Sequence, residues 1–109
     1  MKKKNILKQN SEYNRIIQTF KPIRYKYLSL YIERTTEENY FFGFSVGKKI
    51  GNAVKRNKIK RQLKSIIDKN PYQNGFNCII MVNSGIIKKS FQEIEIDLNK
   101  IIKDINILK

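Results

Sequence analysis

The sequence predicts an α+β domain in which helices pack on one small sheet, in the order helix–strand–strand–helix–strand–helix. Three segments carry apolar residues at helical spacing, two segments alternate as strands do, and a short, nearly continuous apolar run indicates a buried strand. The chain has 109 residues and 40% hydrophobic content. This size and composition suit a single folded domain spanning residues 1–109, with one modest core.

The first helix is expected from about Ser11 to Thr19, with Asn10 or Ser11 as its N-cap. Pro22 follows shortly after and closes the helix. Apolar side chains recur at i, i+3, i+4 and i+7, so one face should pack inward. That face comprises Tyr13, Ile16, Ile17 and Phe20.

Two strands are expected next, over Arg24 to Glu33 and Tyr40 to Val46, and they are predicted to form a hairpin. In the first strand, alternation points the aliphatic residues toward the core and the tyrosines toward the other face, near Gly43 and Ser45. Tyrosines beside small side chains can stack unpaired bases, although they could equally pack beneath the first helix. Both interpretations stay open. The core set is Leu28, Leu30 and Ile32, and the opposite set is Tyr25, Tyr27, Ser29 and Tyr31.

The second half of the chain contains a basic helix, a buried strand and a last helix. Asn52 is the expected N-cap of the basic helix. The strand is expected over Asn77 to Val82, buried on both faces. The motif Ser90-Phe-Gln-Glu93 predicts a capping box. The inward stripes are Ile59, Leu63, Ile66 and Ile67 in the basic helix, and Phe91, Ile94, Leu98, Ile101, Ile102 and Ile105 in the last.

The stretch from Gly43 to Lys64 contains eight cations and no Asp or Glu. Uncompensated charge at this density repels itself, which indicates a polyanionic partner rather than a solvated helix face laced with i,i+4 acids. Its first residues, GFSVGKK, differ from a nucleotide-binding P-loop, since the spacing is one residue short and Lys49 replaces the hydroxyl. The cations are Lys48, Lys49, Lys55, Arg56, Lys58, Lys60, Arg61 and Lys64.

Overall composition narrows the function further. The net charge of +14 favours nucleic acid as the partner, with an anionic membrane surface as the other possibility. The aliphatic stripes are needed for the core, so no membrane partner is expected. The chain has no His, and its carboxylates are scattered, so no protein-based catalytic site is expected. The single Cys78 suits a buried position and a cytoplasmic location.

The sequence GFSVGKKIGNAVKRNKIKRQLK resembles the signature of the bacterial ribonuclease P protein subunit. That family has a Gly-x-Ser-Val strand end, then Lys-Lys-x-Gly-Asn-Ala-Val, then an Arg-Asn-Arg-x-Lys-Arg helix, where Lys58 here replaces the commoner arginine. The resemblance implies an unusual left-handed β-α-β crossover, as in a domain of ribosomal protein S5. It also implies a catalytic RNA that cleaves the 5′ leader from precursor tRNA with Mg²⁺ bound mainly by the RNA. The protein would bind both RNAs, with no protein partner required.

The resemblance also implies roles for individual residues. Ile17 stands where the family usually has a second aromatic of the leader cleft, and Asn83 follows the last strand where Arg is frequent. The resemblance implies that Arg56, Asn57, Lys58, Lys60 and Arg61 contact the catalytic RNA, and that Ser45, Lys48 and Asn52 match polar cleft positions near the substrate. The charge of the stretch adds Lys49, Lys55 and Lys64, so the residues expected to bind RNA are Lys48, Lys49, Asn52, Lys55, Arg56, Asn57, Lys58, Lys60, Arg61 and Lys64. The family's cleft aromatics are matched by Tyr13 and Tyr31, and strand alternation adds Tyr27, so the residues expected in the leader cleft are Tyr13, Ile17, Tyr27, Tyr31 and Ser45. The alternative is a non-enzymatic RNA-binding module such as a ribosomal protein or assembly factor, which fits the charge but not the match over residues 43–64.

Overall fold

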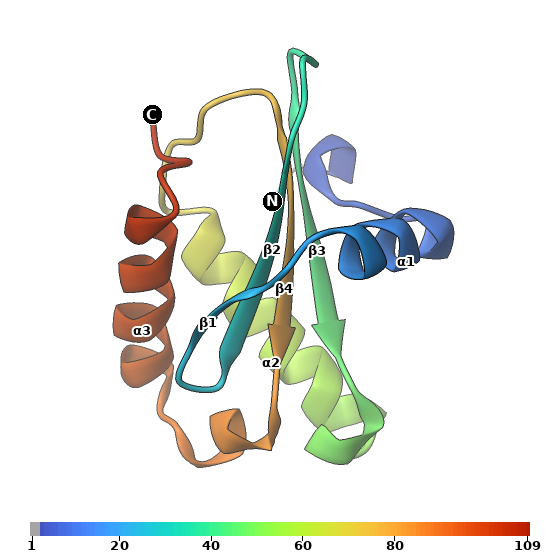
Figure 1. Ribbon diagram of the computed structural model, residues 1–109. Helices are drawn as coiled ribbons and strands as arrows, with labels where there is room; N and C mark the ends of the chain where they lie inside the picture. The colour runs from blue at the N-terminus through green and yellow to red at the C-terminus, as the bar shows by residue number, and fades with distance from the viewer. Residues whose placement is uncertain (1–2) are drawn as a thin grey trace.

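The structure, a computed structural model, describes residues 3–109 and contains one four-stranded sheet with three α-helices (Figure 1). Three short 3₁₀ helices, Lys3–Asn5 (η1), Lys48–Ile50 (η2) and Ser84–Lys88 (η3), lie between the longer elements. The strands are β1 (Ile23–Tyr25), β2 (Leu28–Arg34), β3 (Tyr40–Val46) and β4 (Phe76–Val82), and the helices are α1 (Asn10–Thr19), α2 (Ala53–Ile67) and α3 (Phe91–Asp104).

The sheet has the order β1-β2-β4-β3, so the predicted hairpin between β2 and β3 is wrong. β4 lies between them, antiparallel to β2 and parallel to β3. The physical reason is that β4 is the most apolar strand, and the centre of the sheet buries it on both faces. The connection from β2 to β3 arches over the start of β4, where Gly75 bonds to the backbone of Thr35 and Asn39.

The predicted strand from Arg24 to Glu33 is also interrupted. Lys26 adopts φ 55°, and a tight turn at Lys26 and Tyr27 folds β1 back against β2. The expectation that Tyr27 lies in the leader cleft is therefore wrong. The turn breaks the alternation and buries Tyr27 in the main core, where its hydroxyl donates a 2.8 Å hydrogen bond to Asp97 of α3. Burial raises the pKa of Asp97, but hydrogen bonds from Tyr27 and Lys26 leave that pKa below its ordinary value.

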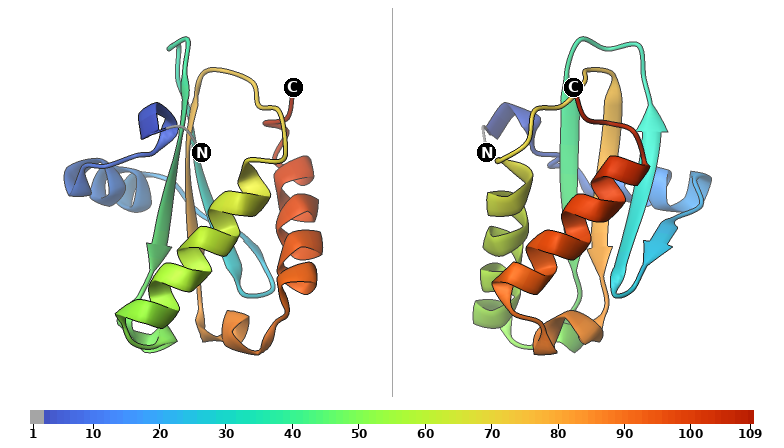
Figure 2. Two further views of the ribbon diagram at one scale, coloured as in Figure 1. Left: turned by 180° about the vertical axis from the view of Figure 1, so that it is seen from behind. Right: turned by 90° about the vertical axis from the view of Figure 1, so that its left-hand side faces the viewer.

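The two faces of the sheet are covered by different helices (Figure 2). On one face, α2 and α3 enclose the main core with their predicted aliphatic stripes. On the other, α1 places its inward residues over a smaller cluster. Both inward faces agree with the helical spacing in the sequence. The smaller cluster buries Ile16, Tyr31 and Ile79, with Leu7, Tyr13, Ile17, Phe20 and Met81 partly buried against it.

The connection from β3 through α2 to β4 is left-handed, as the family resemblance implied. β3 and β4 run in the same direction, β4 lies to the left of β3, and α2 passes behind the sheet (Figure 1). Most parallel crossovers have the opposite hand. The caps at Asn52 and Ser90 are confirmed. The cap predicted for the first helix is wrong, because Gln9 occupies that position with no side-chain hydrogen bond.

Candidate nucleic-acid interface

A glycine turn sets the direction in which α2 leaves the sheet. β3 ends at Val46, η2 follows, and Gly51 adopts φ 149°, a conformation that side chains rarely tolerate. Asn52 then caps α2 by accepting a 3.0 Å hydrogen bond from the backbone N–H of Lys55. The first turn of α2 contains no acidic residue, so the positive end of the helix dipole is not neutralised there.

The residues predicted to bind RNA form one surface, which we call the cationic ridge. It runs along η2 and the side of α2 that faces away from the core. The aliphatic side of α2 is buried as predicted, and most of the polar side chains of the ridge are exposed. Arg56, Lys60 and Lys64 are partly buried, because they lie at the sides of the helix rather than on its most solvent-exposed face. The exposed members are Lys48, Lys49, Asn52, Lys55, Asn57, Lys58 and Arg61.

Most carboxylates of the chain pair with cations outside the ridge. Six of the nine carboxylates of the chain form ion pairs, and each of these pairs uses a cation outside residues 48–64. The cations that are used in this way are Arg15, Lys26, Lys69, Lys89 and Lys100. These ion pairs therefore gather away from the ridge, which presents a strongly positive surface to solvent.

Two residues of the ridge, Lys64 and Arg56, make contact with the body of the fold. Lys64 places its ammonium 5.8 Å from the ring centroid of Phe44 on β3. The Nε atom of Arg56 is buried and has no hydrogen-bond partner among residues 3–109. An unsatisfied buried N–H group costs free energy. The cationic ridge thus contains an unsatisfied donor as well as charge.

The opposite face of the sheet is organised by Tyr13 of α1. Its ring lies so close to Gly43 that a Cβ there would come within 2.8 Å of it. The Tyr13 hydroxyl donates to the carbonyl of Leu7 at 2.9 Å and accepts from the N–H of Phe44 at 3.2 Å. Burial raises the pKa of Tyr13, and the hydrogen bond from Phe44 opposes that shift. Tyr13 therefore fastens α1 and the N-terminal segment to the free edge of β3.

Tyr31 lies on the predicted face, opposite the main core, but only 8% of it is exposed. It packs with Ile16 and Ile79 beneath α1, so of the two open interpretations the packed one describes this residue. Since β4 separates β2 from β3, Tyr31 and Gly43 are not neighbours, although both pair with Ile79. Helix α1 thus covers the row Tyr31–Ile79–Gly43 and leaves little ring surface for a base.

The next row of the sheet is more open. Ser29 and Ser45 flank Met81 in register, and all three are half-buried. We call this set the open row. Partly exposed Ile17 of α1 and Phe20, the residue after α1, pack against the same cluster. The sequence analysis assigned Ile17 and Ser45 to the leader cleft and Phe20 only to the inward face of the first helix, and it did not single out Met81. Their shared face follows from the helical spacing of Phe20 and from the register of β4, which the mistaken hairpin concealed.

Cys78 and the acidic side chains are the other groups that could carry chemistry. Cys78 is fully buried in β4, and burial raises the pKa of its thiol, so it is not a nucleophile. Within residues 3–109, no three Asp, Glu or Cys side chains gather in a group that could hold a metal ion. In the same part of the chain, no helix is long and apolar enough to cross a membrane.

The fold and the cationic ridge define a class of protein, namely a small α+β domain with a surface suited to a polyanion. The family model for ribonuclease P matches residues 1–106. The ribonuclease P protein component of Mycoplasma mycoides is 37% identical over 108 residues, covering 96% of this chain and 99% of that protein. The component from Bacillus cereus strain Q1 is 31% identical over 106 residues, covering 94% and 92%.

Solved structures agree with this assignment at the level of the fold. The Staphylococcus aureus RNase P protein superposes with a TM-score of 0.86 at 23% identity, covering 96% of this chain and 98% of that one. The Thermotoga maritima RNase P protein gives 0.81 at 20% identity, covering 90% and 94%. The chain belongs to the ribonuclease P protein family and is a protein component of that ribonucleoprotein endonuclease.

Proposed function

We propose that residues 1–109 act as a single RNA-binding domain that lays its cationic ridge along the catalytic RNA of ribonuclease P. The RNA subunit contains the catalytic centre, holds the Mg²⁺ ions for the most part, and cleaves the 5′ leader from precursor tRNA. The protein raises the affinity for the substrate and neutralises phosphate repulsion within the particle. No second protein is required for this activity.

One observation carries the proposal, which is that the six carboxylates with ion pairs at described residues all use cations outside the ridge. A chain with nine carboxylates and twenty-three Lys and Arg could have placed acids beside this helix, yet six of those acids pair with cations elsewhere. Phosphates are the natural counter-charges for such a surface. The buried and unpartnered Nε of Arg56 supports the same conclusion, because it offers a donor to an RNA oxygen.

The single-stranded 5′ leader lies on the other side of the molecule, along the open row. Small serines there leave the sheet accessible on either side of Met81, and Ile17 and Phe20 form an apolar wall. Bases can lie against such a surface through van der Waals contact, while Lys48 at the end of β3 is near enough in the chain to approach the backbone. Tyr13 takes part chiefly by fixing the position of α1.

The donor groups of this chain do not fit a resident metal centre. Most of the carboxylates are held in ion pairs, and no group of three candidate ligands gathers among residues 3–109. Mg²⁺ prefers hard oxygen ligands, which the phosphates of an RNA supply in quantity. The role of the protein is therefore to position RNA rather than to activate water.

The test is reconstitution with a bacterial ribonuclease P RNA and precursor tRNA at low Mg²⁺. The wild-type chain should restore 5′ processing, and the protein without the RNA should cleave nothing. A variant with Arg56, Lys60 and Arg61 changed to Ala should restore far less. The matched control changes Lys21, Lys103 and Lys109, all exposed and outside the ridge, and removes the same charge. Equal processing by the two variants, or cleavage by rigorously purified protein alone, would overturn the proposal.

A further inference from the structure

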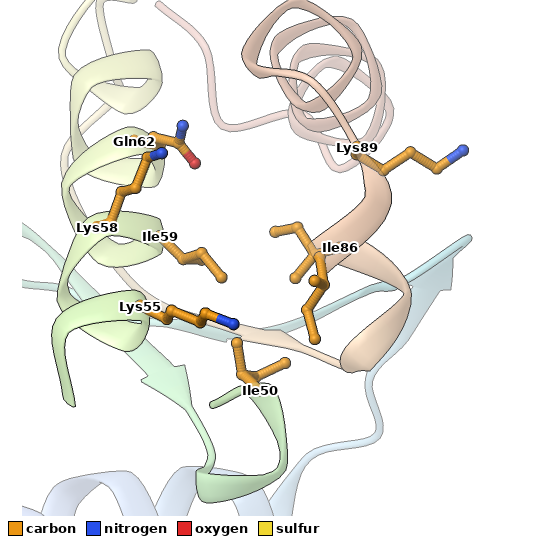
Figure 3. Close-up of a pocket in the computed structure, with 8 residues that line it drawn as sticks. Ile50, Lys55, Lys58, Ile59, Gln62, Ile86 and Lys89 are labelled. Carbon is orange, nitrogen blue, oxygen red and sulfur yellow. The ribbon is translucent and has the colours of Figure 1, made fainter. Parts of the chain in front are cut away.

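A pocket of about 200 Å³ lies beside the cationic ridge, between α2, η2 and η3 (Figure 3). Isoleucines from all three elements line it, namely Ile50, Ile59 and Ile86, and Ile87 of η3 adds a side chain that is 49% exposed. Aliphatic surface that faces solvent next to charged groups is stabilised when a ligand covers it. The pocket therefore has a floor of largely buried isoleucines, and Ile87 at its edge keeps a large exposed aliphatic surface.

The polar groups at the mouth belong to one flank of α2. Lys58 and Gln62 are four residues apart and share that flank, and Lys55 extends across the mouth toward Ile50 (Figure 3). No carboxylate lines the pocket among residues 3–109. Lys89 also contributes to the lining, but it points away from the floor and lies 3.7 Å from Glu93.

Gln62 distinguishes this pocket from a merely basic groove. Its amide is partly buried and makes no hydrogen bond to any residue in the described part of the chain. A free amide offers a donor and an acceptor together, which is the pairing that Gln uses to read the edge of a base. These features match the three parts of a nucleotide. The apolar floor suits the ring, the free amide suits its polar edge, and the two flanking ammonium groups suit its phosphates.

We propose that this pocket takes one unpaired nucleobase of the RNA that lies on the ridge. The base covers Ile87 and rests on the floor formed by Ile59 and Ile86, its edge meets Gln62, and the adjoining phosphates lie at Lys55 and Lys58. The inference rests on the proposed function, because the same helix presents both the ridge and the pocket. The volume is below the range of pockets that enclose drug-sized ligands, so it suits one ring system rather than an extended molecule.

The first test uses the full-length chain with labelled isoleucine methyl groups and two small probes. Adenosine 5′-monophosphate and ribose 5-phosphate share the sugar phosphate and differ in the base. The resonances of Ile59, Ile86 and Ile87 should shift with the nucleotide and stay in place with ribose 5-phosphate. Those of Ile16 and Ile79, on the opposite sheet face, should be unmoved by either. Equal shifts with both probes, or shifts with a hexaglutamate peptide and none with the nucleotide, would overturn the inference.

The second test measures affinity for a bacterial ribonuclease P RNA. Ile87→Ser should weaken binding about five-fold, as expected when roughly half of an isoleucine surface loses its cover. The salt dependence should be unchanged, because no phosphate contact is removed. The control is Ile96→Ser on α3, where the isoleucine is 70% exposed and remote from the pocket lining. Equal affinity of the two variants would contradict the pocket assignment alone, whereas a wild-type chain that failed to bind the RNA would contradict the proposed function.

Discussion

Replacing Tyr31 with Ala tests whether this tyrosine is part of the core or of a leader site. The side chain is 8% exposed and packs between α1 and the sheet against Ile16 and Ile79. Removing a large buried aromatic costs about 3–5 kcal/mol in comparable cores. A domain of this size has roughly 5–15 kcal/mol of total stability, so the loss would be a large share of it. We expect the melting temperature to fall by more than about 10 °C.

Denaturant titration of the full chain measures this loss directly through the unfolding midpoint and slope. The control is Tyr31→Phe, which keeps the ring and removes a hydroxyl that has no hydrogen-bond partner within residues 3–109. It should cost less than about 1 kcal/mol. Precursor and mature tRNA should lose apparent affinity alike with Tyr31→Ala, since the cause is loss of folded protein. An unchanged midpoint together with weaker binding of precursor tRNA alone would refute the packing argument.

Two further predictions concern the contacts that hold the helices on the sheet. Gly43→Ala should destabilise the fold by about 1–3 kcal/mol, because its Cβ would meet the ring of Tyr13 at 2.8 Å, whereas Gly47→Ala, with nothing within 4 Å, should have little effect. Adding Tyr13→Leu should recover part of the Gly43→Ala loss, and strictly additive unfolding energies would contradict the clash. Asp97→Asn should cost about 1–3 kcal/mol at pH 7 by weakening the hydrogen bond from Tyr27. Folding lowers the pKa of Asp97, so the stabilisation from its carboxylate is present above the unfolded pKa of about 3.9 and is lost as pH falls through the folded pKa. A stability difference between wild type and Asp97→Asn that persisted unchanged at pH 2 would contradict this assignment.

The elements that the sequence predicted well are those whose periodicity and caps are local properties. The stripe of α2, the buried strand β4 and the Ser90 capping box each depend on residues a few positions apart. The order of strands in the sheet, in contrast, does not depend on residues that are near each other in the sequence. The place of β4 between β2 and β3 depends on which strand gains most from burial on both faces, and that competition involves the whole chain.

The candidate site divides in the same way. The cationic ridge could be predicted from charge and helical spacing alone, because most of its residues lie on one helix. The assignment of Tyr27 to a cleft failed because Lys26 adopts a left-handed conformation without the Gly or Asn that usually signals such a turn. The pocket beside α2 had no signal in the sequence, because η2, α2 and η3 contribute residues that are up to 39 positions apart, from Ile50 to Lys89.

The salt dependence of assembly with a bacterial ribonuclease P RNA tests the role of the cationic ridge most directly. Each lost phosphate contact lowers the slope of log K against log salt by roughly 0.7–0.9. Changing Arg56, Lys60 and Arg61 to Ala should therefore lower the slope by roughly 2–3, while the charge-matched triple variant at Lys21, Lys103 and Lys109 should keep the wild-type slope. Identical slopes for all three proteins would contradict RNA binding by the ridge.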